Sequence, residues 1–327
     1  MIDWRHYLRD ARATLSAVAV FVALFALYTL NHPAGFSANV VQTAANKGVL
    51  LAFVAVGQTF VVLTAGIDLS VGAVFILSDC LASVVVTGTP LQVAFGVAAV
   101  LATGTACGFA NGALVVFGRL QPIVATIASG AIYFGLALVL RPEPGGDVDG
   151  TLSDSVTGQL PGGVPASVAV LLGVMLLVWV PFRRSLIGRA VYAVGSSESS
   201  AYLSGLPIRR ARLLAYSLAG LCSALGGLML AFFIYSGEAS ASNASTYTLD
   251  SIAAVVIGGV SLFGGAGSAV GAVFGALIFR TINDLLFVFD LDPLWQPLFL
   301  GLVLLIAVSL GSLRLLRIKN RLDLFGS

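Results

Sequence analysis

The feature that most constrains this chain is a series of long apolar segments separated by short polar ones. An α-helix rises about 1.5 Å per residue, so roughly 20 mostly apolar residues span a bilayer. The segments near that length lie at residues 13–31, 48–66, 70–88, 91–117, 122–140, 164–182, 209–235, 250–262, 268–283 and 296–313. The sequence therefore predicts an all-α, polytopic membrane protein of about ten transmembrane helices, with a single transmembrane domain over residues 1–327.

Composition excludes the other broad classes. Charged residues make up 10% of the chain, whereas a soluble domain has about 25%. So few charges could not cover the surface of a soluble body of this size. A soluble enzyme, a disordered protein and a nucleic-acid-binding protein are excluded as descriptions of the whole chain.

The eighth apolar segment, residues 250–262, is short and runs into two glycine pairs, Gly258-Gly259 and Gly264-Gly265. It is expected to be a re-entrant or broken helix, which is tolerated where protein or a water-filled cavity covers the backbone. Residues 66–75 also resemble residues 265–274. A duplicated helix hairpin would explain this similarity, and so would chance in sequences rich in Gly, Ala and Val.

Positive charge is distributed unevenly between the two sides that ten spans define. One side, which holds both termini, carries Arg5, Arg9, Arg12, Arg119, Arg183, Arg184, Arg189, Arg209, Arg210, Arg212, Arg314, Arg317, Lys319 and Arg321. The other carries Lys47, Arg141 and Arg280. Lys and Arg are enriched in cytoplasmic loops, so both termini are predicted to be cytoplasmic. Residues 141–163, rich in Gly, Pro, Ser and Asp, are then a solvated outer loop, and residues 183–208 are a cytoplasmic loop.

Two carboxylates occur at membrane depth. An ionised carboxylate at the bilayer centre costs at least about 2.5–3.5 kcal/mol, so it should face protein or water rather than lipid. Asp68 lies between the second and third apolar segments. It either lines a polar pathway or, with Ser70, caps the helix that follows. Asp79 lies near the middle of the third segment. It is interpreted as a pathway or interhelical packing residue, with a protonated bystander as the alternative.

Four neutral polar residues also lie inside apolar segments, at Gln58, Thr59, Asn111 and Thr126. Each could form a hydrogen bond between helices, worth about 0.6 kcal/mol on average, or a hydrogen bond to a polyhydroxylated solute. Their number favours a substrate pathway that also includes Asp68 and Asp79.

No catalytic or cofactor motif occurs in the chain. There is no His pair, Gly-x-Ser-x-Gly turn, HExxH or phosphate-binding loop, and the three cysteines lack metal-site spacing. The sequence therefore predicts no enzyme, no metal and no cofactor, and any ATP used for transport must be hydrolysed by another chain.

Four ordered motifs resemble one known family, the ribose-type permeases of bacterial ABC importers in the branched-chain/ribose permease superfamily. The first is the run from Gly57 to Gly72, GQTFVVLTAGIDLSVG. The second is Asn111-Gly112 followed by LQPIVAT at residues 120–126. The third is the run at residues 188–195, which leads to Leu203-Ser204-Gly205, and the fourth is IGGVSLFGG at residues 257–265. The resemblance covers about residues 40–312.

The resemblance implies a permease with a type II-like importer fold in the bacterial inner membrane. Its expected partners are a second permease copy or paralogue, two cytoplasmic ABC ATPase domains, a periplasmic sugar-binding protein and the lipid bilayer, with no nucleic acid. The expected contact with the ATPase is the segment from Glu198 to Gly205, which includes Tyr202, Leu203 and Ser204. Its residues Glu198 to Leu203 are predicted to form a short helix that Gly205-Leu206-Pro207 ends. Arg209, Arg210 and Arg212 follow and either dock the ATPase or anchor the chain at the membrane.

The sequence departs from the family pattern at three places. Phe134 precedes Gly135-Leu136-Ala137 where the family often has Arg, and residues 195–202 replace a commoner Gly-Gly-Asn pattern. Asp79 is also foreign to the pattern. The sequence therefore assigns no particular sugar. The alternative function is a stand-alone secondary transporter of a small polar solute, in which Asp68 or Asp79 carries a coupling proton, and a membrane-embedded enzyme is a third class.

Overall fold

The computed structural model describes residues 4–295, 298–299, 301–302, 305–306 and 309. The α-helices are α1 (Trp4–Asn31), α2 (Ala38–Val62), α3 (Val71–Val85), α4 (Pro90–Val116), α5 (Pro122–Leu140), α6 (Gly150–Thr157), α7 (Ala166–Val174), α8 (Val180–Arg184), α9 (Leu186–Ser196), α10 (Glu198–Leu203), α11 (Ile208–Ile234), α12 (Ala241–Ile257) and α13 (Ala269–Val288). A π-helical turn at Met175–Trp179 joins α7 to α8, a 3₁₀ turn covers Pro293–Trp295, and strands β1 (Gln159–Leu160) and β2 (Val164–Pro165) form a small hairpin.

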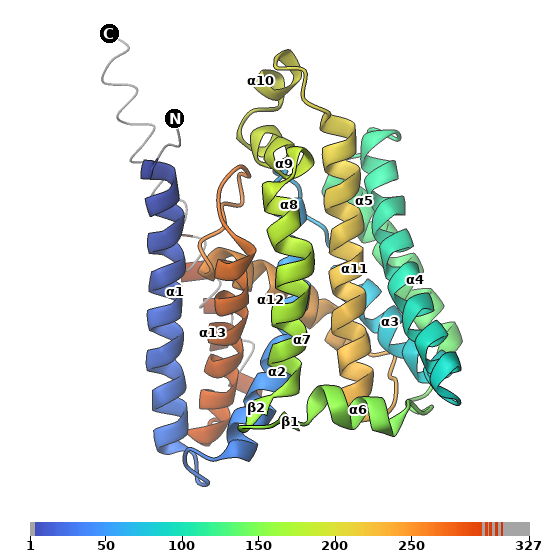
Figure 1. Cartoon of the computed structure of the whole chain (residues 1–327), viewed down its shortest axis with the longest axis vertical. Coiled ribbons are helices and arrows are strands. Elements are labelled where there is room, and N and C mark those ends of the chain that lie inside the picture. Colours follow the sequence, from blue (N-terminus) through green and yellow to red (C-terminus); the bar gives the residue numbers. More distant parts are fainter. Residues whose placement is uncertain (1–3, 296–297, 300, 303–304, 307–308, 310–327) are drawn as a thin grey trace.

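Seven helices of the described part are long and apolar enough to cross a membrane. They are α1, α2, α4, α5, the continuous segment Ala166–Arg184, α11 and α13. Helix α3 has 15 residues and α12 has 17, so both are shorter than the seven. The protein is thus a polytopic helical bundle (Figure 1). Most of the expected tenth span, residues 296–313, lies outside the described residues.

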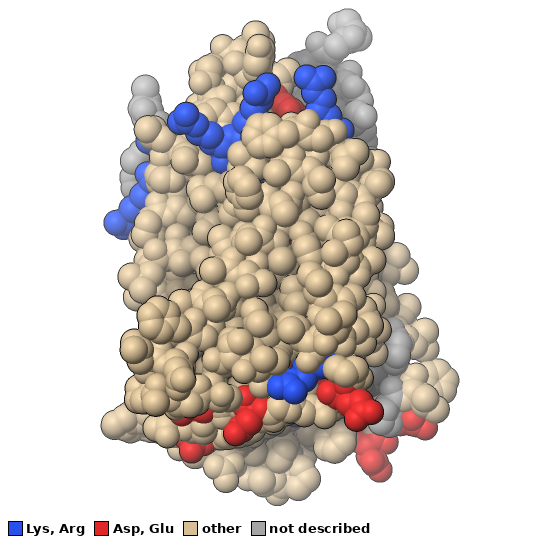
Figure 2. Space-filling view, turned by 90° about the vertical axis from the view of Figure 1, so that its right-hand side faces the viewer, with Lys and Arg blue, Asp and Glu red and all other residues tan. Residues whose placement is uncertain are grey.

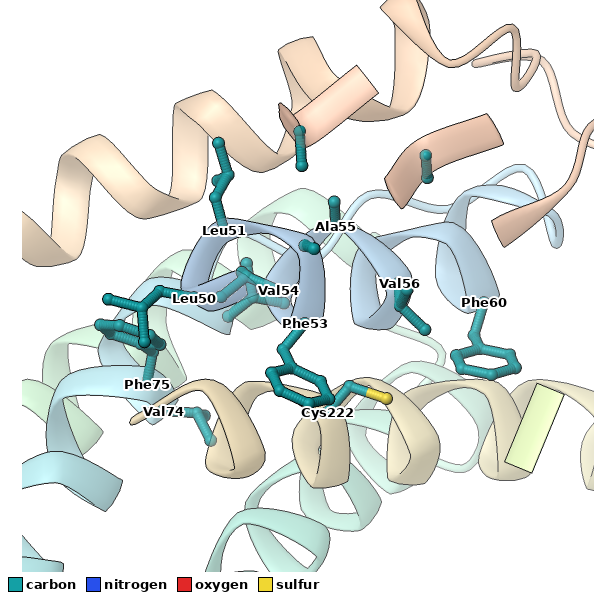
Figure 3. Close-up of a cluster of buried hydrophobic side chains, with 14 of the residues drawn as sticks. Leu50, Leu51, Phe53, Val54, Ala55, Val56, Phe60, Val74, Phe75 and Cys222 are labelled. Atoms are coloured by element: carbon teal, nitrogen blue, oxygen red, sulfur yellow. The ribbon is translucent and has the colours of Figure 1, made fainter. Parts of the chain in front are cut away.

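Helix α2 forms the centre of the bundle. Buried residues make up 89% of its most apolar stretch, against 33% in α4 and in α5. Figure 3 shows Phe53 and Phe60 pointing from α2 toward α11, where Cys222 lies. Lipid is as apolar as Leu, so this core is stabilised by close van der Waals packing rather than by removal from water.

Small residues let the helices around α2 approach closely. A Cβ atom on Gly220 of α11 would lie 2.1 Å from the carbonyl oxygen of Gly104 on α4, and one on Gly57 of α2 would lie 2.9 Å from that of Ala219. Real Cβ atoms essentially never show separations under 3.0 Å. Glycine is therefore required where α11 crosses α4 and α2.

Two non-helical links lie inside the bundle, one between α2 and α3 and one between α12 and α13. The chain leaves α2 at Val62 and enters α3 at Val71, and it leaves α12 at Ile257 and enters α13 at Ala269. The break expected near the eighth apolar segment is present, although α12 begins nine residues earlier than the expected start at residue 250. The two similar segments, 66–75 and 265–274, each run from such a break into a helix.

The loop at residues 141–163 is more ordered than its Gly, Pro and Ser content predicted. Its second half forms α6 and the strand β1, and Asp149 caps α6 by accepting from the Leu152 amide at 2.7 Å. Helix α2 also holds the loop in place, because Gln42 and Asn46 of α2 both donate to the Thr157 carbonyl at 2.8 Å.

The two long loops lie at opposite ends of the bundle. The α6 segment and the β-hairpin are at one end, and α9 and α10 are at the other, together with the first turn of α1 (Figure 1). Lys and Arg gather at the α10 end, whereas Asp and Glu gather mostly at the α6 end (Figure 2).

At the α6 end the Tyr235 hydroxyl donates to Asp154, and this hydrogen bond raises the pKa of Tyr235 above its usual value.

Candidate functional site

The break between α2 and α3 carries a buried polar network around Asp68. The Asp68 carboxylate accepts from the Ser70 amide at 2.8 Å and from the Ser70 hydroxyl at 2.6 Å. The Asn111 side chain of α4 donates to the Ser70 hydroxyl at 2.7 Å. Tyr133 of α5 donates to the Asn111 oxygen at 3.1 Å. One chain of hydrogen bonds therefore connects the break to α4 and α5.

The start of α3 is held by two threonines from other helices. Thr126 of α5 accepts from the Leu69 amide at 3.0 Å, and Thr248 of α12 accepts from the Gly72 amide at 3.1 Å. These bonds satisfy amide groups at a helix start buried within the bundle. The Asp68 carboxylate binds the amide of Ser70, which is the N-cap residue of α3 and makes no side-chain capping bond of its own.

Three of the six expected pathway residues, Asp68, Asn111 and Thr126, are thus brought together around the start of α3. All three side chains belong to residues that are at most 2% exposed. Ser70 and Tyr133 complete the network, and the sequence pattern did not place them in the pathway. Tyr133 could have been found as the one tyrosine within the fifth apolar segment.

Gln58 and Thr59 lie elsewhere, on buried α2. The Thr59 hydroxyl donates to the Ala55 carbonyl of its own helix at 2.7 Å. Both amide atoms of Gln58 are buried and have no hydrogen-bond partner among the described residues. Burying an unpaired polar group costs free energy. Among the six expected pathway residues, Gln58 is the one whose side-chain amide is left with both its donor and its acceptor unpaired in this conformation.

Asp79 is separate from the network and faces protein, as expected of a membrane carboxylate. One carboxylate oxygen accepts from the Glu238 amide, in the link between α11 and α12, at 2.9 Å. The other oxygen is buried without a hydrogen-bond partner among the described residues. Asp79 therefore ties α3 to that link.

The segment from Glu198 to Gly205 has the structure that the sequence predicted. Helix α10 spans Glu198–Leu203, and the Ser197 hydroxyl accepts from the Ser200 amide at its start. Gly205 has a φ of +70°, which favours glycine, and turns the chain toward α11. Tyr202 is 74% exposed and Leu203 is 84% exposed. The tip of α10 thus presents two large hydrophobic side chains at the basic end of the molecule.

A pocket of about 830 Å³ lies beside α10. Its apolar lining comes mostly from the end of α4, the start of α5 and the start of α11, and four arginines also line it. It is lined by Val115, Val116, Arg119, Leu120, Pro122, Glu198, Tyr202, Leu206, Pro207, Ile208, Arg209, Arg210 and Arg212. Arg212 donates to Glu198 at 2.6 Å, whereas Arg209 and Arg210 are exposed. The cations around this single carboxylate leave a net positive pocket that suits an acidic partner.

A second pocket, of about 500 Å³, lies near the opposite end between α1, α2 and α13. Asp284 there lies 3.9 Å from the Lys47 ammonium and 3.4 Å from the Arg280 guanidinium. Both cations, which the sequence assigns to the outer side, lie within helices, Lys47 in α2 and Arg280 in α13. Asp284 is the acidic partner of both.

Within the described residues, no group of three or more His, Cys, Asp or Glu side chains could hold a metal ion. The three cysteines are buried and unpaired. The two candidate functional regions are the polar network around Asp68 and the tip of α10 with the pocket beside it.

Comparison with known proteins shows which family the chain belongs to. Residues 40–308 match the family described as "Branched-chain amino acid transport system / permease component". The chain is 37% identical over 280 residues to the ribose import permease RbsC of Bacillus subtilis, covering 83% of each chain. It is 34% identical to RbsC of Escherichia coli K12, covering 91% of this chain and 92% of the relative.

A third relative is the fructose import permease FrcC of Rhizobium meliloti, 32% identical over 94% of this chain and 87% of its own length. No solved structure matches the chain. The resemblance to ribose-type permeases that the four motifs indicated is confirmed, and the chain belongs to the branched-chain amino acid transport system / permease component family.

Proposed function

We propose that this chain is the membrane permease subunit of an ATP-driven importer that moves a sugar or sugar-like solute from the periplasm to the cytoplasm. Similarity to ribose and fructose import permeases over more than four fifths of the chain carries the proposal. The bundle of apolar helices provides the membrane body. The chain itself is not an enzyme, and a separate ATPase chain hydrolyses ATP.

The proposed topology has ten spans in the bacterial inner membrane, with both termini and the α10 end in the cytoplasm. The segregation of Lys and Arg to the α10 end supports this orientation (Figure 2). The α6 end, which carries most of the acidic groups, then faces the periplasm, where the sugar-binding protein delivers the solute.

The proposed partners follow from the same assignment. They are a second permease, two cytoplasmic ATPase domains and the periplasmic binding protein. Helix α10 is the ATPase contact, because Tyr202 and Leu203 are exposed at its tip and tyrosine is among the residues that most often anchor the centre of a protein interface. Arg209 and Arg210, which line the adjacent pocket, pair with acidic ATPase residues.

The proposed solute route uses Gln58, Thr59, Asp68, Asp79, Asn111 and Thr126. All six are buried here, so in this proposal they become hydrated when the helices separate during transport. The two helix breaks support this role, because irregular backbone within a membrane is found where it is covered by protein or lines a cavity.

The test of the ATPase contact is Tyr202→Pro, measured in vesicles that contain the ATPase and the binding protein. Proline removes an amide and clashes with the preceding turn, at a cost of about 3 kcal/mol or more inside a helix. We expect substrate-stimulated ATP hydrolysis and uptake to be lost while the permease still inserts. The matched control is Ser199→Ala, an exposed position on the same helix, which should keep both activities. Full activity in an inserted Tyr202→Pro variant would show that the contact lies elsewhere.

A further inference from the structure

The two helix breaks touch each other. The Gly265 amide, in the break between α12 and α13 (residues 258–268), donates to the Leu63 carbonyl, in the break between α2 and α3 (residues 63–70), at 3.1 Å. Ala65 and Gly264 meet beside this bond, since a Cβ on Gly264 would lie 2.7 Å from the Ala65 nitrogen. The breaks are therefore in direct backbone contact, although about 200 residues of chain separate them.

The last turn of α9 rests on both breaks at once. A Cβ on Gly195 would lie 2.0 Å from the Leu63 oxygen and 2.5 Å from the Gly265 nitrogen. The Tyr192 hydroxyl, one turn earlier, donates to the Gly267 carbonyl at 2.8 Å. We call these residues, Leu63, Tyr192, Gly195, Gly265 and Gly267, the α9 junction. Only glycine at position 195 allows this approach.

Helix α9 is also firmly connected to α10. One residue, Ser197, separates the two helices. Its amide donates to the Ala193 carbonyl of α9, and its carbonyl accepts from the Ala201 amide of α10, both at 3.0 Å. A displacement of α10 is thus passed to α9 without an intervening loop.

The connection from α10 to α11 is weaker. It passes through four residues, 204–207, that include exposed Gly205. The side-chain bond across it joins Arg212 to Glu198, whose side chain is 54% exposed. Exposed ion pairs contribute little, so this route would absorb part of a displacement.

We propose that the α9 junction transmits ATPase movement to both helix breaks, and that Gly195 and Tyr192 are its positioning residues. This inference rests on the proposed function. One break carries Asp68 and Ser70, whose network reaches α4 and α5, and the other leads directly into α13. Movement of α9 therefore shifts the polar network and α13 together.

The first test compares Gly195→Ala with Gly173→Ala, a helical glycine of α7 with no atom within 4 Å of an added Cβ. Both are measured in vesicles with the ATPase and binding protein. Substitutions within a coupling network change coupling by roughly two- to thirtyfold. We expect Gly195→Ala to lower uptake and the substrate stimulation of ATP hydrolysis within this range, with basal hydrolysis and complex assembly retained. Gly173→Ala should match the wild type.

A second readout follows the movement itself. Phe263, in the break between α12 and α13, is 65% exposed, and the three native cysteines are buried. The labelling rate of Phe263→Cys should change when ATP and vanadate trap the wild-type complex. The change should be lost in the Gly195→Ala background and kept in the Gly173→Ala background.

Tyr192→Phe keeps the ring but removes the hydrogen bond to Gly267, so it tests the junction even where Gly195→Ala fails to assemble. It should reduce stimulation, by less than Gly195→Ala does. Normal coupling and a normal labelling change in both junction variants would overturn the inference. Absence of stimulation in the wild-type complex would instead refute the proposed function.

Discussion

The Asn111→Ala substitution would remove two buried hydrogen bonds from the start of α3. The amide donates to the Ser70 hydroxyl at 2.7 Å and accepts from Tyr133 at 3.1 Å, and Asn111 is 0% exposed. Ser70 keeps its bond to Asp68, and Tyr133 keeps a 3.0 Å bond to the Cys107 carbonyl, so neither hydroxyl loses every partner. Interhelical hydrogen bonds in membranes contribute about 0.6 kcal/mol on average and at most about 1.7. Two of them give an expected loss of about 1–2 kcal/mol.

The assay is reversible unfolding in mixed micelles, followed by ellipticity. A double-mutant cycle with Ser70→Ala isolates the 2.7 Å bond, and its coupling energy should be about 1 kcal/mol because the bond belongs to a network that ends on a carboxylate. Asn243→Ala, at an exposed position of α12, is the control and should change stability by less than about 0.5 kcal/mol. A coupling energy below about 0.3 kcal/mol, within the scatter of independent sites, would refute the reasoning.

Two further predictions concern topology and packing. A cysteine replacing exposed Ser155 of α6 should react with an impermeant label on intact cells, and one replacing exposed Ser199 of α10 should not; the reverse pattern would invert the proposed orientation. Gly220→Ala should lower the stability of the bundle by about 1–3 kcal/mol, because its Cβ would lie 2.1 Å from the Gly104 oxygen. A melting temperature in detergent equal to that of Gly173→Ala would show that α11 and α4 can separate without cost.

Sequence reasoning succeeded where the determining interactions are local. The bounds of α10 agree with the prediction because Ser197 caps its start and Gly205 ends it within a few residues. The bonds between Asp68 and Ser70 are local as well, since the two residues are two positions apart. Local chemistry of this kind leaves a direct trace in the sequence.

The rest depends on contacts between distant segments. The bond from Asn111 to Ser70 spans 41 residues, and the bonds that order the loop at 141–163 reach it from Gln42 and Asn46 across more than 100 residues. Apolar periodicity carries no information about such pairs. The α9 junction is similar. The sequence places Gly195 at the end of the third family motif, but its contacts come from two breaks that only the fold brings together.

The central claim is that this permease imports a solute with energy from a partner ATPase. The direct test is uptake into proteoliposomes that hold the permease and the ATPase, with the binding protein and a panel of labelled sugars outside. ATP enclosed with the ATPase should drive accumulation of at least one sugar, and dissipating the proton gradient should leave the rate unchanged. Uptake that persists without the ATPase and stops when the proton gradient is removed would contradict the account and favour a secondary transporter, with Asp68 or Asp79 carrying the proton.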